Sequence, residues 1–93
     1  MRISQHEQTV IKNVITQLDP KAKVYLFGSR VDDNARGGDI DLLILSELIT
    51  ERDRRKIRIE LFEKLGEQKL DLVIAKDLDK PFARLAYNGG VLL

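Results

Sequence analysis

The sequence predicts a small α/β (α+β) fold, in which helices flank a small mixed β-sheet in the order α-β-(short α)-β-α-β-α. Two observations support this prediction. Apolar residues recur at helical spacing in two segments, and three short runs are rich in β-branched, aliphatic or aromatic side chains, as strands are. Helical and strand segments alternate along the 93 residues, which predicts one α/β domain spanning 1–93.

The first expected helix begins near Ser4, because Ser4 and Glu7 have the spacing of a capping box. It ends at Asp19, since the residue before Pro20 avoids the helical conformation. Its apolar stripe consists of Val10, Ile11, Val14, Ile15 and Leu18.

Two strands are expected next. Residues 24–27 form a short apolar run that stops at Gly28-Ser29, and a polar stretch with loop composition follows. Residues 39–45 are apolar on both faces after their first three positions. This pattern predicts a strand that is covered on both sides.

A second helix, a third strand and a third helix complete the expected fold. Thr50 and Asp53 resemble another capping box, and Gly66 is placed to end the helix. Residues 70–75 form the third strand, a helix runs from Pro81 to residue 88, and the apolar tail 91–93 is expected to pack on the domain itself. The stripe of the second helix consists of Ile57, Leu61, Phe62 and Leu65.

The composition excludes several classes of protein. Without cysteine, the chain has no disulfide, thiolate zinc site or thiol nucleophile. Its one histidine, His6, falls on the polar face of the first helix and argues against a histidine-rich metal centre. The mixed charges sum to +1, so no direct nucleic-acid binding is expected. No targeting segment or membrane span is apparent, and we expect a cytoplasmic protein without a membrane partner.

The expected topology brings several polar residues to one edge of the sheet. A helix joins strands 39–45 and 70–75, which is the connection that parallel neighbours need. Their starts, with Asp39, Asp41 and Asp71, therefore lie at the same edge. Strand 24–27 returns without a long helix, so its end at Gly28-Ser29 is expected beside them.

These residue types suit a metal and a phosphate. Asp39 and Asp41 share one face of a strand, about 6.5–7 Å apart between Cα atoms, and repel each other unless a cation lies between them. Mg²⁺ prefers such oxygen ligands, and Asp71 provides enough carboxylates for a pair of ions. Gly28-Ser29 offers backbone N–H groups and a hydroxyl to a phosphate. Each feature alone is more typical of a solvated strand edge or an ordinary turn.

The string Phe27-Gly28-Ser29-Arg30, followed by residues 39–43 (Asp-Ile-Asp-Leu-Leu), resembles the signature of the DNA polymerase β-like nucleotidyltransferase superfamily. Residues 70–73 (Leu-Asp-Leu-Val) resemble the third acidic strand of that family. The small size and the closing segment 81–92 resemble the minimal nucleotidyltransferases of prokaryotes. Where the family often has serine before the first aspartate, this chain has Gly38, which removes one hydroxyl ligand.

The resemblance implies a role for each of these positions. Asp39 and Asp41 would hold Mg²⁺ on the triphosphate of ATP, and Asp71 would complete the metal site and help to deprotonate the acceptor hydroxyl. Gly28 and Ser29 would bind the β- and γ-phosphates, with Arg30 as a charged helper. Arg36 also lies within reach in sequence, although an exposed loop arginine is more often only solvated.

Members of the minimal group are similar to antitoxins that pair with a HEPN-domain RNase toxin and adenylylate it, typically on a tyrosine. The resemblance therefore implies a hetero-oligomeric partner. A domain of 93 residues has room for a site that binds a metal and a triphosphate, but little room for a second site that binds the acceptor. We therefore expect the partner protein to hold the acceptor. The alternatives are a transferase acting on an aminoglycoside-like small molecule, and a non-catalytic antitoxin that neutralises its partner by contact alone.

Overall fold

The computed structural model describes residues 1–32 and 38–93. A mixed sheet of four strands lies at the centre of this part of the chain. Its strand order is β3-β2-β1-β4. The predicted class and the order of the main elements are confirmed, and the short helix after the first strand is a 3-10 turn, η1. The strands are β1 (Lys23–Phe27), β2 (Ile40–Leu45), β3 (Leu70–Ala75) and β4 (Val91–Leu92). The helical segments are α1 (Gln5–Leu18), η1 (Gly28–Val31), η2 (Glu51–Asp53), α2 (Arg54–Leu65) and α3 (Pro81–Asn88).

The strand directions agree with the predicted topology. Strands β2 and β3 are parallel and are joined through η2 and α2, whereas β1 and β2 are antiparallel neighbours. The apolar tail packs on the domain as expected, but it does so as a fourth strand: Leu92 pairs with Tyr25 of β1, and Leu93 is buried.

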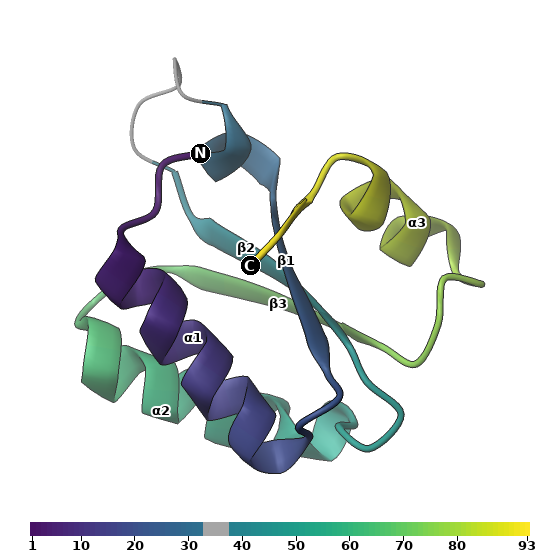
Figure 1. Ribbon diagram of the computed structural model, residues 1–93, viewed down its shortest axis with the longest axis horizontal. Coiled ribbons are helices and arrows are strands. Elements are labelled where there is room, and N and C mark those ends of the chain that lie inside the picture. The colour runs from purple at the N-terminus through teal and green to yellow at the C-terminus, as the bar shows by residue number, and fades with distance from the viewer. Residues whose placement is uncertain (33–37) are drawn as a thin grey trace.

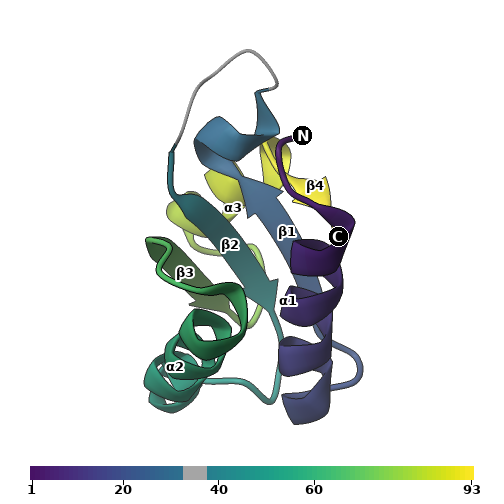
Figure 2. The ribbon, with the colours of Figure 1, turned by 90° about the vertical axis from the view of Figure 1, so that its left-hand side faces the viewer.

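Helices cover both faces of the sheet, with α1 and α2 on one side and α3 on the other (Figures 1 and 2). Because successive side chains of a strand point to opposite faces, the even-numbered residues of β2, such as Leu42, pack in the core with α1 and α2. Leu43 instead packs with Ala83 and Ala86 of α3. Residues 42–44 are all fully buried, so the prediction of a strand covered on both sides is confirmed.

The helix ends follow the predicted signals. Ser4 and Glu7 form a capping box at α1, and Asp19 caps its other end. Thr50 and Asp53 also form a capping box, but it encloses η2, and α2 begins one residue later. Gly66 ends α2 with a positive φ of 85°. The expected apolar stripe of α2 is wrong at Phe62, which is 47% exposed, whereas Ile57 and Leu61 are fully buried.

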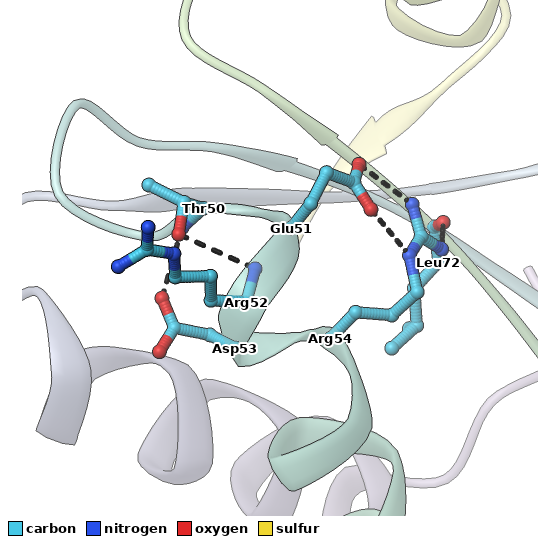
Figure 3. A network of polar contacts seen from close by, with 6 residues as sticks. All are labelled: Thr50, Glu51, Arg52, Asp53, Arg54 and Leu72. Atoms are coloured by element: carbon cyan, nitrogen blue, oxygen red, sulfur yellow. Dashed lines mark hydrogen bonds and ion pairs between the residues drawn. The ribbon is translucent and has the colours of Figure 1, made fainter.

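Two arginines of α2 bind the outer edge of β3. Arg54 forms a bidentate ion pair with Glu51, at 2.7 and 2.9 Å, and donates to the backbone carbonyl of Leu72. Figure 3 shows these contacts. Arg58, one turn later, donates to the carbonyl of Leu70 at 2.8 Å. These contacts satisfy acceptors that an edge strand otherwise leaves open to other chains.

A buried polar cluster closes the end of the sheet where β2 and β3 finish. Asp19 and Ser46 are 4% and 5% exposed, and the Ser46 hydroxyl donates to the Asp19 carboxylate at 2.6 Å. The same hydroxyl accepts from the backbone N–H of Ile49 at 2.8 Å. Hydrogen bonds from Ser46 and from the backbone N–H of Lys21 hold the pKa of Asp19 below its ordinary value.

Within the described residues, no helix is both long and apolar enough to cross a bilayer.

Candidate active site

Asp41 and Asp71 lie directly opposite each other on the parallel strands β2 and β3. Asp41 is also the register partner of Phe27, the last residue of β1. The ends of three strands therefore meet here, as the expected topology requires. Asp41 and Asp71 occupy odd-numbered positions, so they lie on the sheet face that α3 covers, at its exposed margin.

The two carboxyl groups are close enough to share a proton. The pKa of Asp41 is raised to about 6, chiefly by burial, then by the hydrogen bond and the negative charge of Asp71, with a smaller contribution from Asp39. Mutual repulsion between acids at this edge was expected for Asp39 and Asp41. The dominant partner of Asp41 is instead Asp71, because adjacent parallel strands bring opposed residues closer than positions i and i+2 of one strand.

Asp39 does not join the pair. It lies just before β2, and its carboxylate is 3.7 Å from the ammonium group of Lys69, the residue before β3. No group of three or more histidine, cysteine, aspartate or glutamate side chains in residues 1–32 and 38–93 is arranged to hold a metal ion. The close approach is thus between Asp41 and Asp71, and Asp39 lies in a partly exposed ion pair with Lys69 beside them.

Gly28 packs directly against the carboxylate of Asp41. A Cβ atom at this position would lie 2.1 Å from Oδ2 of Asp41, and the φ of Gly28 is +76°. Both facts require glycine, because an L side chain disfavours this backbone region and would occupy the space of the carboxylate. The turn after β1 therefore approaches the acidic pair as closely as the backbone allows.

Ser29 and Gly38 have a similar relationship. A Cβ atom at Gly38, whose φ is +94°, would lie 2.2 Å from the Ser29 hydroxyl oxygen. A serine at position 38, which is frequent in the family that the sequence resembles, would thus collide with Ser29 in this arrangement. Gly28 and Ser29 are both exposed, so their polar groups are accessible to a ligand.

The remaining residues considered from the sequence are Arg30, His6 and Arg36. Arg30 directs its Nε and Nη1 atoms to the backbone carbonyls of Gly38 and Arg2, at 3.2 and 3.0 Å. His6 is exposed, as expected for a surface residue. Arg36 lies outside the described residues.

Sequence reasoning missed two residues at this edge. Lys69 carried a usable signal, because it immediately precedes the strand that bears Asp71 and so had to lie near the starts of β2 and β3. Arg2 carried none. Its contact with the turn depends on the path of the chain before α1, which residue spacing does not encode.

The arrangement combines acceptors for a cation with donors for an anion. The pair of carboxyl groups offers oxygen ligands of the kind that hard divalent cations prefer. The exposed glycine-serine turn beside it offers backbone N–H groups and a hydroxyl.

A separate cavity of about 520 Å³ lies at the opposite end of the sheet, between Lys21, Lys23, Leu48 and Lys76.

Comparison with known proteins agrees with this geometry. The family model described as "Polymerase beta, Nucleotidyltransferase" matches residues 9–93, which include all four strands, the glycine-serine turn and the three acids. No curated protein matches the chain. The matched region far exceeds half of the sequence, and the chain therefore belongs to the polymerase beta family of nucleotidyltransferases.

Proposed function

We propose that this nucleotidyltransferase is a minimal, antitoxin-type member of the family, which uses Mg²⁺ and transfers AMP from ATP to a tyrosine hydroxyl of a HEPN-domain toxin in the cytoplasm. The observation that carries the proposal is the contact between the Asp41–Asp71 pair and the turn at Gly28. It joins the two parts that phosphoryl-type transfer requires, a charge-neutralising site and a phosphate-binding turn.

The residues at this edge fit a divalent cation. Asp41 and Asp71 form a carboxyl pair in which the pKa of Asp41 is raised to about 6, and a cation between them would replace the shared proton. Asp39 would be the third ligand after release from Lys69, whose ion pair is weak because the lysine side chain is 78% exposed. Mg²⁺ bound by these residues would neutralise charge on the phosphate oxygens.

The turn after β1 would hold the triphosphate. Glycine at position 28 lets phosphate oxygens reach the backbone N–H groups, and the exposed Ser29 hydroxyl adds a donor. Arg30 contributes positive charge to the same turn, although two of its donors already bind backbone carbonyls. Together these groups would fix the β- and γ-phosphates so that the α-phosphorus faces the acceptor.

In the proposed reaction, the acceptor hydroxyl attacks the α-phosphorus, and the bond to the β-phosphate oxygen breaks. The hydroxyl proton passes to the carboxylate of Asp71, and pyrophosphate leaves. Asp71 suits this role because it is exposed at the sheet edge, where an acceptor can approach it. Asp41 is less exposed and packs behind Gly28, which suits a ligand more than a base.

The exposure of the site favours an acceptor that a second macromolecule presents. Gly28, Ser29 and Asp71 are all exposed, and the cavity of about 520 Å³ lies at the other end of the sheet, where it is of no use for holding the acceptor. A partner protein that carries its own surface meets this need better than a small molecule, which requires an enclosing pocket.

The experiment compares the partner after co-expression with the wild-type chain and with an Asp39→Asn/Asp41→Asn double variant. Intact-mass spectrometry of the toxin should show a gain of one or more AMP units with the wild type and none with the variant. Glu67→Gln, a change of an exposed carboxylate in the loop before β3, should leave the gain intact.

Two other outcomes would replace the proposal. Neutralisation of the toxin by the double variant without any mass gain would assign a binding-only antitoxin. A mass gain on an aminoglycoside incubated with chain, Mg²⁺ and ATP, with none on the toxin, would assign a small-molecule transferase.

A further inference from the structure

The start of the chain binds the turn that carries Gly28 and Ser29. The backbone N–H of Arg2 donates to the carbonyl of Arg30 at 2.7 Å. Its guanidinium donates from Nη2 to the carbonyl of Ser29 at 3.0 Å, and from Nε to that of Asp32 at 2.9 Å. Both ribbon views place the N-terminus beside this turn (Figures 1 and 2).

Arg30 in turn donates hydrogen bonds to the start of the chain and to Gly38. Its Nη1 atom donates to the carbonyl of Arg2 at 3.0 Å, and its Nε atom donates to that of Gly38 at 3.2 Å. Together with the bond from Arg2 to Asp32, these contacts hold the chain at position 32 and again at position 38. We call this set of hydrogen bonds between residues 2, 29, 30, 32 and 38 the clasp.

The clasp adds to two other contacts of the turn, the packing of Gly28 against Asp41 and of Val31 against the core. The η1 segment spans only Gly28–Val31, and no side chain caps its start. Such short 3-10 segments have poor internal hydrogen-bond geometry and rely on their surroundings. The peptide group is planar and trans, so a carbonyl of Ser29 held by Arg2 turns the N–H of Arg30 to the opposite side. The clasp therefore sets the direction of the Arg30 N–H group, which directly follows the glycine-serine pair.

We propose that Arg2 is a positioning residue, which orders the phosphate-binding turn through its fork of donors without touching the nucleotide. This inference rests on the proposed function, because it assigns a use to the turn that the proposed nucleotide occupies. Loss of the guanidinium should weaken nucleotide binding about tenfold, the effect of a change near 1.4 kcal/mol, and should raise KM far more than it lowers kcat.

The shape of the side chain separates this role from a simple attraction of phosphate by positive charge. Lysine keeps the charge of Arg2 but cannot place two N–H donors on the carbonyls of Ser29 and Asp32 in the same way. Arg2→Lys should therefore behave like Arg2→Ala. If charge alone matters, the lysine variant should restore binding.

Two measurements on the full chain test the clasp. Hydrogen exchange of the backbone N–H groups in residues 28–32 reports the order of the turn without any nucleotide. Calorimetric titration with Mg²⁺ and an ATP analogue that has a methylene group between the α- and β-phosphates reports nucleotide affinity.

Ser4→Ala is the matched control, because it removes the hydroxyl that caps α1 near the same terminus and leaves the clasp intact. Arg55→Ala controls for the loss of one exposed arginine elsewhere. Circular dichroism verifies that each variant folds.

Loss of protection at residues 28–32 together with about tenfold weaker binding in both Arg2 variants, and in neither control, supports the proposal. Unchanged protection in Arg2→Ala, or full recovery of affinity in Arg2→Lys, overturns it. If the wild-type chain itself fails to bind the analogue, the proposed function fails, and the positioning role fails with it. The exchange data then still show whether Arg2 orders the turn.

Discussion

The carboxylate of Asp41 occupies the space in which a side chain on residue 28 would begin. A Cβ atom there would lie 2.1 Å from Oδ2 of Asp41. This relationship connects the end of β1 to the start of β2, and it ties a glycine of the candidate phosphate-binding turn to an acid of the candidate metal site.

Gly28→Ala should abolish nucleotidyl transfer and destabilise the fold. The positive φ alone costs about 1–2 kcal/mol for an L residue, and displacement of Asp41 adds to that cost. Gly66→Ala is the matched control, because Gly66 has a similar φ of +85° and nothing within 4 Å of the added methyl group. Thermal unfolding and a transfer assay on both variants isolate the clash. Full transfer activity in Gly28→Ala would contradict the close contact with Asp41.

Asp41→Asn should make the protein more stable and less active. At pH 7 the change removes the repulsion between Asp41 and Asp71, which should add about 1 kcal/mol because water screens part of it, or about 4–8 °C in Tm. Activity should fall by about 10²-fold or more, since a charge that acts in the transition state is lost. Asp79→Asn, at an exposed loop position, should change neither quantity. A drop in Tm for Asp41→Asn would refute the repulsion.

The stability of the wild-type chain should depend on pH through Asp41. Folding raises the pKa of this group from 3.8 to about 6, so between about pH 4 and 6 the folded chain binds more protons than the unfolded chain. The contribution of Asp41 to the free energy of unfolding should therefore decrease as the pH rises through this window and level off above it. Urea unfolding across this range, with Asp41→Asn as the reference, measures the contribution. Parallel curves for the two proteins would show that the pKa is not raised.

Ser46→Ala should destabilise the fold without affecting catalysis. The change leaves the buried Asp19 carboxylate and the N–H of Ile49 without their shared hydroxyl, which should cost about 1–3 kcal/mol. Thr50→Ala removes a hydroxyl that also accepts from a backbone N–H, but an exposed one, so its cost should be smaller. Denaturant unfolding and a transfer assay check both variants. Loss of transfer activity in folded Ser46→Ala would show that this end of the sheet takes part in the reaction.

The sequence predicts most of the fold because its signals are local. Capping boxes, the proline at position 81 and the apolar runs place α1, α3 and three of the strands within one or two residues. The start of α2 is displaced by three residues, because η2 occupies Glu51–Asp53. Strand β4 escapes prediction because two residues form a strand only when they pair with β1. The exposure of Phe62 also escapes prediction, because helical spacing does not show which positions of an apolar stripe are covered.

The candidate site is predictable to the level of strand register. Parallel order predicts that Asp41 and Asp71 lie together, and the structure agrees. The pairing of Asp39 with Lys69 depends on the side-chain conformations of the residues just before β2 and β3. Neither residue spacing nor composition determines these conformations. Arg2 reaches the turn through a chain path that only the folded structure reveals.

The most direct test of the account is to map where a nucleotide binds. Backbone amide resonances of the isotope-labelled chain are followed by NMR during titration with Mg²⁺ and the methylene-bridged ATP analogue. We expect the shifts to centre on residues 28–30, 41 and 71, and we expect Asp41→Asn to suppress them. Shifts centred on the cavity between Lys21, Lys23 and Lys76, unchanged in that variant, would contradict it.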